Sequence, residues 1–192
     1  MVNSNENIRQ KKNILNKDLS ILEYFKPRLY LLLFNKTPNH AYFNRWRLYF
    51  LKKTGMKLAG KNIIFSPIYI SPKTIPENIE IGVNTFINSG CRFSAPKGTK
   101  IKIGKNSLIG PNVCFETVNH FLPYRGVLAR GAQLGDIIIE EGVWICMNSL
   151  ILQNSIVRKG CVIAAQSTVN STFDASQLIG GTPAKIIKDI KN

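Results

Sequence analysis

Residues 139–169 read IEEGVWICMNSLILQNSIVRKGCVIAAQSTV, and in this stretch an aliphatic side chain returns at every sixth position. The aliphatic positions are Ile139, Ile145, Ile151, Val157, Ile163 and Val169. Four residues after each of the first five stands a small or short side chain, at Val143, Ser149, Ser155, Cys161 and Ser167. This period matches neither an amphipathic helix nor the two-residue alternation of a half-buried strand. It is typical of a β-helix whose coils have three short strands and a tight turn at each corner.

The same period occurs earlier in the chain, and its interruptions are informative. It is seen at Ile81, Ile87 and Phe93, with Ile75 in the same phase, and again at Ile103, Ile109 and Phe115. The pattern predicts an all-β fold, a parallel β-helix whose coils begin near Lys61. A turn-rich excursion is expected at 95–98, and a loop that projects from one edge is expected at 121–136. Long ordered loops of this kind often carry function.

The N-terminal region differs in character from the repeat. Residues 1–19 are polar and are expected to be loosely ordered. Residues 20–35 could form a short helix that is interrupted or begun near Pro27. A second helix is predicted from an N-cap at Thr37, with Pro38 in its first turn, to a stop at Gly55. Its aromatic and basic residues interleave: Tyr42, Phe43, Arg45, Trp46, Arg47, Tyr49, Phe50, Lys52 and Lys53.

This basic aromatic helix has two readings, which could hold together. It could close the first coil, because solenoids need capping ends and an apolar helix face is usually buried. It could instead lie in a membrane interface. The predicted organisation is therefore a helical extension over 1–60, a β-helix over 61–170 and a basic tail over 171–192. The tail leaves the repeat and could fold back as a strand or a short helix.

Charge and cysteine content restrict the class of protein. There are 26 Lys and Arg against 11 Asp and Glu, a formal charge of +15. This excess favours anionic partners, although no nucleic-acid-binding module is recognisable. The four cysteines form no CxxC pair and fall inside repeat blocks, which indicates reduced, structural thiols in a cytoplasmic protein. No signal peptide is recognisable, and the apolar run 29–34 is too short to span a bilayer.

Histidine is scarce, which makes its position informative. His40 and His120 are the only two, so a three-histidine metal site within one chain is impossible, and we expect no metal. His120 directly precedes the predicted projecting loop, at the point where the regular repeat is interrupted. A neutral imidazole can act as a general base toward a hydroxyl near neutral pH. His120 is the candidate base, and His40 the candidate for a purely structural role.

Several motifs resemble those of the hexapeptide-repeat O-acetyltransferases. They are the repeat itself, Asn-His at 119–120, GVWI at 142–145 and GGTPAKII at 180–187, together covering residues 60–188. The maltose and galactoside acetyltransferases and the colanic-acid-type polysaccharide acetyltransferases are the most similar groups. The resemblance implies a left-handed parallel β-helix, a homotrimer with active sites between subunits, and acetyl-CoA as acetyl donor.

The resemblance also implies roles for individual residues. His120 matches the base that removes the proton from a sugar hydroxyl, and Asn88 matches the asparagine that holds the acceptor. Trp144 matches the tryptophan beside the histidine, although it could equally be packed between coils. Glu116 lies four residues before His120 and could orient it, as could a backbone carbonyl. The positions that match CoA contacts are Met147, Ala165, Asn170, Ser171, Lys185 and Lys188.

Two departures from the family pattern bear on CoA binding. Ile145 is followed by Cys146 where glycine is usual, and Asn170 and Ser171 replace the usual Thr-Lys. Lysine at 185 and 188 keeps the positive charge but lacks the bidentate fork of arginine.

The sequence predicts an acetyl-CoA-dependent O-acetyltransferase that modifies a sugar hydroxyl of a polysaccharide or glycan precursor. It would act in the cytoplasm, with a peripheral contact to the inner membrane face as a further expectation. Two alternatives stay open: N-acetylation of an amino-sugar nucleotide, and a non-catalytic β-helix scaffold with a basic membrane-binding arm.

Overall fold

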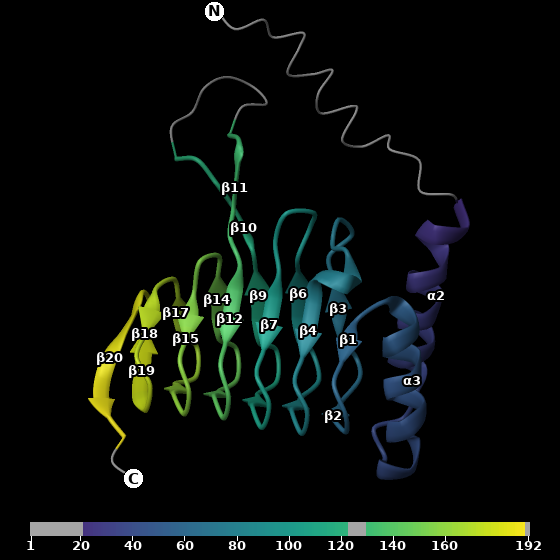
Figure 1. Cartoon of the computed structure of the whole chain (residues 1–192), viewed down its shortest axis with the longest axis horizontal. Coiled ribbons are helices and arrows are strands. Elements are labelled where there is room, and N and C mark those ends of the chain that lie inside the picture. The colour runs from purple at the N-terminus through teal and green to yellow at the C-terminus, as the bar shows by residue number, and fades with distance from the viewer. Residues whose placement is uncertain (1–20, 123–129, 191–192) are drawn as a thin grey trace, which may run out of the picture.

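The chain winds into a triangular prism that is closed at its N-terminal end by two helices (Figure 1). This computed structural model describes residues 21–122 and 130–190. Successive coils stack along the prism axis, and each coil contributes one short strand to each of three parallel sheets. The fold is the left-handed parallel β-helix that the six-residue period and the family resemblance predict.

The elements fall into three sheets and a helical cap. Sheet A contains β1 (Lys57–Leu58), β4 (Ile79–Ile81), β7 (Ile101–Ile103), β12 (Ile137–Ile139), β15 (Ile156–Val157) and β18 (Thr172–Phe173). Sheet B contains β2 (Ile63–Ile64), β5 (Phe86–Ile87), β8 (Leu108–Ile109), β13 (Trp144–Ile145), β16 (Val162–Ile163), β19 (Gln177–Gly181) and β20 (Ala184–Asp189). Sheet C contains β3 (Tyr69–Ile70), β6 (Arg92–Ser94), β9 (Cys114–Glu116), β14 (Leu150–Leu152) and β17 (Thr168–Val169). The helices are α2 (Ile21–Lys36) and α3 (Asn44–Thr54), with 3-10 turns η1 (Ala41–Phe43) and η2 (Pro76–Asn78).

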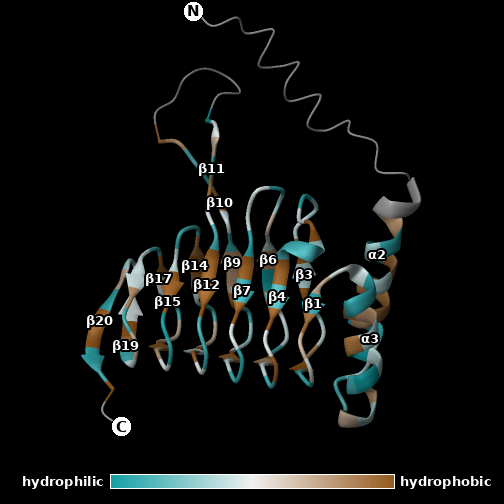
Figure 2. Cartoon of the chain, in the orientation of Figure 1, coloured by the Kyte–Doolittle hydropathy of each residue, from teal (hydrophilic) through white to brown (hydrophobic). Residues whose placement is uncertain are grey.

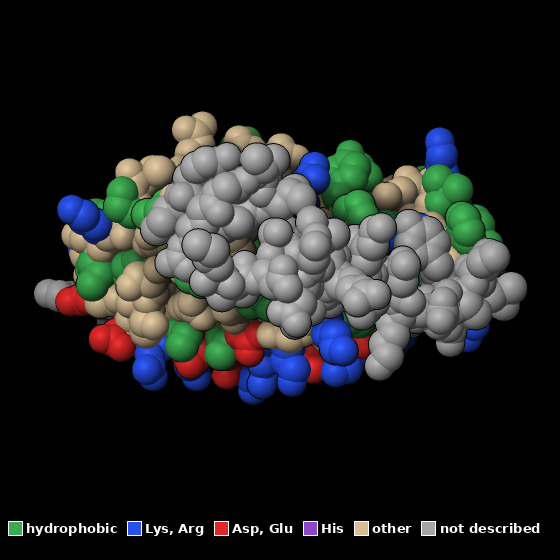
Figure 3. Space-filling model, turned by 90° about the horizontal axis from the view of Figure 1, so that it is seen from above, with side chains coloured by type: hydrophobic (Ala, Val, Ile, Leu, Met, Phe, Trp, Pro, Cys, Tyr) green, Lys and Arg blue, Asp and Glu red, His purple; other side chains and the backbone are tan. Residues whose placement is uncertain are grey.

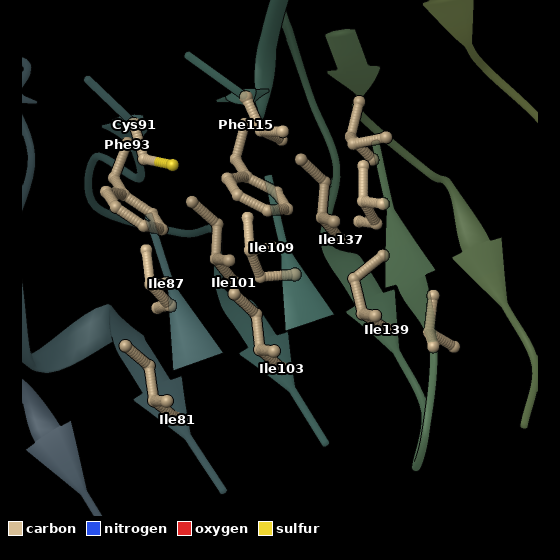
Figure 4. Close-up of a cluster of buried hydrophobic side chains, with 14 of the residues drawn as sticks. Ile81, Ile87, Cys91, Phe93, Ile101, Ile103, Ile109, Phe115, Ile137 and Ile139 are labelled. Atoms are coloured by element: carbon tan, nitrogen blue, oxygen red, sulfur yellow. The ribbon is translucent and has the colours of Figure 1, made fainter. Parts of the chain in front are cut away.

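The repeated aliphatic positions fill the prism interior, as predicted. Ile87, Ile109 and Ile145 stack in register on sheet B and are fully buried. On sheet C, the rings of Phe93 and Phe115 stack with centroids 5.2 Å apart (Figure 4). Each such side chain contributes roughly 1.5–3 kcal/mol before the entropy of ordering is subtracted. The fold is therefore stabilised by short rows of side chains rather than by one large core.

The small residues of the repeat bend the chain at the corners. The Ser149 hydroxyl donates to the carbonyl of Ala164 at 3.1 Å, and the Ser155 hydroxyl to that of Val169 at 3.1 Å. A short polar side chain at these positions therefore satisfies turn carbonyls that the strands leave unpaired. Cys91 and Cys161 are buried free thiols, which agrees with their predicted structural role.

The helical cap covers the open end of the first coil. The Asn35 side chain donates to the carbonyl of Ile68 and accepts from its amide, both at 2.9 Å. Asn39 makes the same pair of contacts with Ser66. Arg47, fully buried, donates to the carbonyls of Ile64 and Pro38. These bonds satisfy a strand edge that would otherwise invite pairing with another chain, so capping, one of the two readings of this region, is confirmed.

The first helix agrees with its predicted residues but not with the predicted break at Pro27, and the second helix begins later than predicted. The first helix continues through Pro27, because the burial of Phe34 and the packing of Leu31 against the core offset one lost backbone bond. The second begins at Asn44 rather than at Thr37. The Thr37 hydroxyl donates to the carbonyl of Leu33, at the end of the first helix, so it does not cap the second one. Gly55, with φ of 107°, ends the second helix as predicted.

Two further expectations about the repeat differ from the structure. Ile75 keeps the six-residue phase but is 37% exposed, because η2 intervenes and Ile79 fills the interior instead. The coils also extend beyond both predicted limits, from β1 to β19. The connection between β17 and β18 is shorter than the regular corners, so Phe173 pairs with Val157 out of phase with the repeat. The tail then folds back as strand β20, one of its two predicted forms.

Three edges join the sheets, and we name each by the two sheets that it links. The A–B edge contains 82–85, 104–107, 140–143 and 158–161. The B–C edge contains 88–91, 110–113, 146–149 and 164–167. The C–A edge contains 71–78, 95–100, 117–122, 130–136, 153–155 and 170–171. The long connections all lie on the C–A edge. The longest includes the antiparallel pair β10 (Val118–His120) and β11 (Ala132–Leu134), which projects away from the prism as an arm (Figure 1).

Candidate functional site

His120 lies in the arm, where the projecting chain leaves the prism. It ends β10 and pairs across the arm with Ala132, and its side chain is exposed. Its Nδ1 is 3.2 Å from the carbonyl oxygen of Arg130. A carbonyl oxygen can only accept, so this contact requires a proton on Nδ1, and in the neutral ring the lone pair then lies on Nε2. The imidazole is thus held in the tautomer that a general base needs.

Arg130 holds the same part of the arm through its side chain. Its guanidinium Nη1 donates to the carbonyl oxygen of Leu122 at 2.6 Å. Its own carbonyl meanwhile faces His120, so one residue contacts both the histidine and the chain that directly follows it. Sequence reasoning missed Arg130, because a backbone contact leaves no side-chain pattern to find.

The carboxylate of Glu116 contacts the backbone of the arm and does not contact the ring of His120. Its Oε1 accepts from the amide of Val118 at 3.2 Å, so it fixes the first residue of the arm. The amide of His120 is held in the same way by Oδ1 of Asn119, at 2.8 Å. Of the two orienting groups proposed from the sequence, the carbonyl is the one that lies at the ring of His120.

Three of the predicted residues lie along the B–C edge. Asn88 is on an early coil, and its Oδ1 accepts from the amide of Ser89 at 2.8 Å. Met147 and Ala165 are exposed on two later, adjacent coils, where the carbonyl of Met147 accepts from the amide of Gln166 at 3.0 Å. The same edge therefore carries both a predicted acceptor residue and two predicted CoA residues, separated along the prism axis.

Trp144 lies beside this edge on the outer face of sheet B. It pairs laterally with Leu108 and Val162 and remains 49% exposed. It is therefore available to a ligand or a partner, and it is not enclosed between coils. Its neighbours continue an apolar row along the sheet: Ile63, Phe86, Leu108, Val162 and Leu178.

The predicted CoA residues divide between two edges. Lys185 and Lys188 are exposed on β20, where Lys185 lies opposite Gly180 at the end of the B–C edge. Asn170 and Ser171 are exposed on the C–A edge, where the Ser171 carbonyl accepts from the amide of Ile156. The C–A edge therefore carries His120, Asn170 and Ser171, with Glu116 at the adjoining end of β9, and sheet C separates this edge from the B–C edge. One chain alone does not bring all the predicted residues together.

Charge is distributed unevenly over the prism. Acidic and basic side chains gather along one long margin in Figure 3, which the ion pairs place on sheet A and the A–B edge. Lys57 Nζ is 2.8 Å from Glu80 Oε1, and Lys105 and Lys159 flank Glu141 at 3.6 and 3.8 Å. Exposed pairs of this kind contribute little to stability. They do mark a solvated margin, distinct from the apolar row on sheet B.

Within the described residues, no cluster of three or more His, Cys, Asp or Glu side chains could hold a metal ion. In the same part of the chain, none of the helices is long and apolar enough to cross a membrane.

Comparison with solved structures places the chain in a family. A hexapeptide-repeat-containing acetyltransferase from Vibrio cholerae is 30% identical, covers 86% of this chain and 89% of its own, and superposes with a TM-score of 0.74. The chain belongs to the hexapeptide-repeat acetyltransferases. The same V. cholerae protein in complex with acetyl-CoA matches with a TM-score of 0.77 at 29% identity, covering 88% of each chain.

Two other acetyltransferases are similar to a shorter part of the chain. Galactoside O-acetyltransferase of Lactococcus lactis is 27% identical over 143 residues, which are 74% of this chain and 67% of that protein. A Schizosaccharomyces pombe protein with a provisional acetyltransferase name is 34% identical over 116 residues, 60% of this chain; the chain spans about half of its length, 55%. None of the known family profiles matches the chain.

Proposed function

We propose that the chain transfers the acetyl group of acetyl-CoA to a sugar hydroxyl of a polysaccharide or glycan precursor. The observation that carries the proposal is His120, whose Nδ1 faces the Arg130 carbonyl, so that the neutral ring would present the lone pair of Nε2 to an acceptor. His120 takes the proton from the acceptor hydroxyl as the hydroxyl oxygen attacks the thioester carbonyl. The acetyl ester forms, the carbon–sulfur bond breaks, and the proton passes to the departing thiolate.

The B–C edge has the properties that a CoA chain requires. Ala164 and Ala165 place only small side chains on it, and Ala165 is exposed. Exposed Met147 supplies apolar contact, and Lys185 supplies positive charge for phosphates. When bound, acetyl-CoA would supply the activated acetyl group. The V. cholerae relative with bound acetyl-CoA supports this assignment.

The separation of the two edges favours a site shared between chains. His120 lies on the C–A edge, whereas Asn88, Met147 and Ala165 lie on the B–C edge. A closed ring of identical chains would place one edge of each chain against the other edge of the next. The apolar row on sheet B and the arm, with exposed Phe121 and Leu122, are surfaces that such an assembly could cover. We propose a homotrimer.

The direct test is an acetyl-transfer assay with purified protein, acetyl-CoA and a panel of sugars, followed by thiol release. His120→Ala should lower kcat by about 10²–10⁴-fold, the range for loss of a general base. His40→Ala is the matched control, because the His40 ring lies in the helical cap, where it accepts from the amide of Tyr42 and stacks on the Tyr42 ring. Full activity of His120→Ala would remove the proposed base.

The same assay separates the two alternatives. An acetyl ester is lost in mild alkali, whereas an acetamide survives, so product stability distinguishes O-acetylation from N-acetylation of an amino-sugar nucleotide. A scaffold without activity would neither release thiol nor bind acetyl-CoA in calorimetry.

A peripheral membrane contact is a separate part of the proposal. On α2 and α3 the side chains of Phe25, Leu29 and Trp46 are 59%, 55% and 58% exposed. A groove of about 410 Å³ runs beside them, lined by Leu33, Lys36, Thr37, Pro38, Phe43, Trp46 and Phe50. Figure 2 shows that hydrophobic residues recur along the two helices, and the basic residues Lys36, which lines the groove, and exposed Arg45 lie on them. Such a surface suits the headgroup region of an anionic membrane.

Flotation with vesicles tests this contact. The protein should float with vesicles rich in anionic lipid and less with neutral ones, and Leu29→Ser with Trp46→Ser should reduce flotation. Ile186→Ser, at the opposite end of the prism, is the control. Equal flotation of all variants would contradict the contact.

A further inference from the structure

Along the prism axis, the predicted CoA residues and the predicted acceptor residue lie on opposite sides of the coil of His120. The inference drawn from this order rests on the proposed function. Met147, Ala165 and Lys185 lie on coils that follow the coil of His120 in the chain, whereas Asn88 lies on a coil that precedes it. If CoA occupies the later coils, then the rest of the acceptor must extend over the earlier ones. On the edge that carries His120, those coils present the connections 71–78 and 95–100.

The connection 95–100 packs against the base of the arm, and the connection 71–78 packs against 95–100. The Thr117 hydroxyl donates to Thr99 Oγ1 at 2.9 Å, which joins the second connection to the arm. A methyl group at Gly98 would lie 3.7 Å from Cδ1 of Leu134 in β11. The amide of Ala95 donates to Thr74 Oγ1 at 3.0 Å, which joins the second connection to the first. A continuous surface therefore leads from the arm toward the N-terminal end of the prism.

Two exposed lysines stand on this surface, Lys97 and Lys73. Within residues 21–122 and 130–190, neither lies in an ion pair, unlike Lys105 and Lys159 on the A–B edge. They are exposed cations on the side of His120 that the acceptor would occupy.

The carboxylates on this edge and at the end of β9 contact groups other than the two lysines. Glu77 lies against Gly55 at the end of α3. Asp136 accepts from the amide of Lys100 at 2.7 Å, and Glu116 accepts from the amide of Val118. Asp136 and Glu116 thus accept from backbone amides, and within the described residues none of the three carboxylates forms an ion pair with either lysine. The positive potential at Lys97 and Lys73 faces solvent and would attract an anion.

We infer that the acceptor is a sugar that carries a phosphate group, and that Lys97 and Lys73 bind this group while the hydroxyl lies at His120. The phosphate could belong to a sugar phosphate or to the diphosphate of a nucleotide-linked sugar; the recognising chemistry is the same for both. Lysine suits this task as a point charge that does not demand a fixed approach.

The test compares kcat/KM for three acceptors at fixed acetyl-CoA: a neutral sugar, its 1-phosphate and its nucleoside-diphosphate derivative. The 1-phosphate or the nucleoside-diphosphate form should be preferred over the neutral sugar by about tenfold, as two exposed charge contacts allow. Lys73→Gln with Lys97→Gln should abolish this preference, and high salt should weaken it. Lys105→Gln with Lys159→Gln is the matched control and should retain the preference.

The outcomes distinguish this inference from the function on which it rests. A better rate with the monophosphate identifies a sugar phosphate, and a better rate with the nucleoside diphosphate identifies a nucleotide sugar. Equal kcat/KM for neutral and phosphorylated sugars, or a preference that persists in the Lys73 and Lys97 variant, overturns the inference and leaves acetyl transfer intact. Absence of transfer to every acceptor overturns the proposed function and the inference together.

Discussion

At the scale of the residue, the orientation of His120 depends on Arg130. Its carbonyl receives Nδ1 of His120, and its guanidinium fixes the carbonyl of Leu122. Arg130→Gln keeps the backbone carbonyl but loses the charged donor that holds it in place. We expect kcat to fall about tenfold, because misplacing a base weakens proton transfer without removing it.

Two readouts separate positioning from a general loss of structure. The KM for acetyl-CoA and the unfolding midpoint of Arg130→Gln should stay near those of the wild type, and Arg130→Lys should restore part of kcat. A parallel drop in kcat and stability, or no effect of Arg130→Gln on kcat, would contradict the positioning role.

Cys91 gives a residue-scale prediction about pH. Burial raises the pKa of its thiol to about 12, whereas the unfolded chain ionises near the ordinary value of 9.0. Between these values the folded state holds a proton that the unfolded state has lost, so stability falls as the pH rises above 9. Relative to Cys91→Ser, which keeps a donor but does not titrate, wild-type stability should fall by about 2 kcal/mol between pH 9 and 10.5. Urea unfolding at each pH measures this; a constant difference would show that Cys91 ionises freely.

At the scale of the element, the corners of the prism differ in what they tolerate. A methyl group at Gly104 would lie 2.5 Å from the backbone carbon of Glu140 on the next coil, so Gly104→Ala must push two coils apart. Gly142 has φ of 68°, and a methyl group there would have no atom within 4 Å. Asn106 has φ of 58° at the equivalent corner one coil earlier, so asparagine is compatible with this backbone conformation. Gly104→Ala should therefore cost about 1–3 kcal/mol, whereas Gly142→Asn should be close to neutral. Thermal unfolding of both variants checks this, and equal losses would contradict the coil-contact argument.

The walls of the prism were predictable because every repeat unit meets the same surroundings. Ile145 and Ile163 follow one rule, and that rule is visible in the chain itself. The C–A edge could not be predicted in the same way, because its connections differ in length. Ile75 occupies a position in the six-residue phase but is exposed, whereas Phe173 is buried although it departs from that phase. Periodicity reports burial only where the corner length is constant.

The residues of the candidate site also divide into those that could be predicted from the sequence and those that could not. His120 could be found from the sequence because it stands where the repeat breaks. Arg130 could not, since its contact with the histidine is made by a carbonyl that any residue possesses. The start of α3 at Asn44 was also hidden, because Thr37 and Pro38 form a plausible N-terminus that the chain uses instead to end α2.

At the scale of the whole molecule, the distribution of residues over two edges implies a test of assembly. His120→Ala removes the base on the C–A edge. Ala165→Trp would fill the exposed B–C edge where the CoA chain is proposed to lie, without touching the core. Each variant alone should be inactive. Co-refolded in equal amounts, they should recover about a quarter of wild-type activity, because one shared site in four combines an intact His120 edge with an intact Ala165 edge.

The control is the same mixture prepared from separately folded proteins, which should stay inactive while their subunits do not exchange. Sedimentation should show the mass of three chains for each variant and for the mixture, so that lost activity is not lost assembly. A site contained within one chain gives no recovery in the mixture, because every chain then carries one damaged edge. Recovery near a quarter would instead require that the arm of one chain and the B–C edge of another form a single site, as the separation of His120 from Ala165 by sheet C leads us to expect.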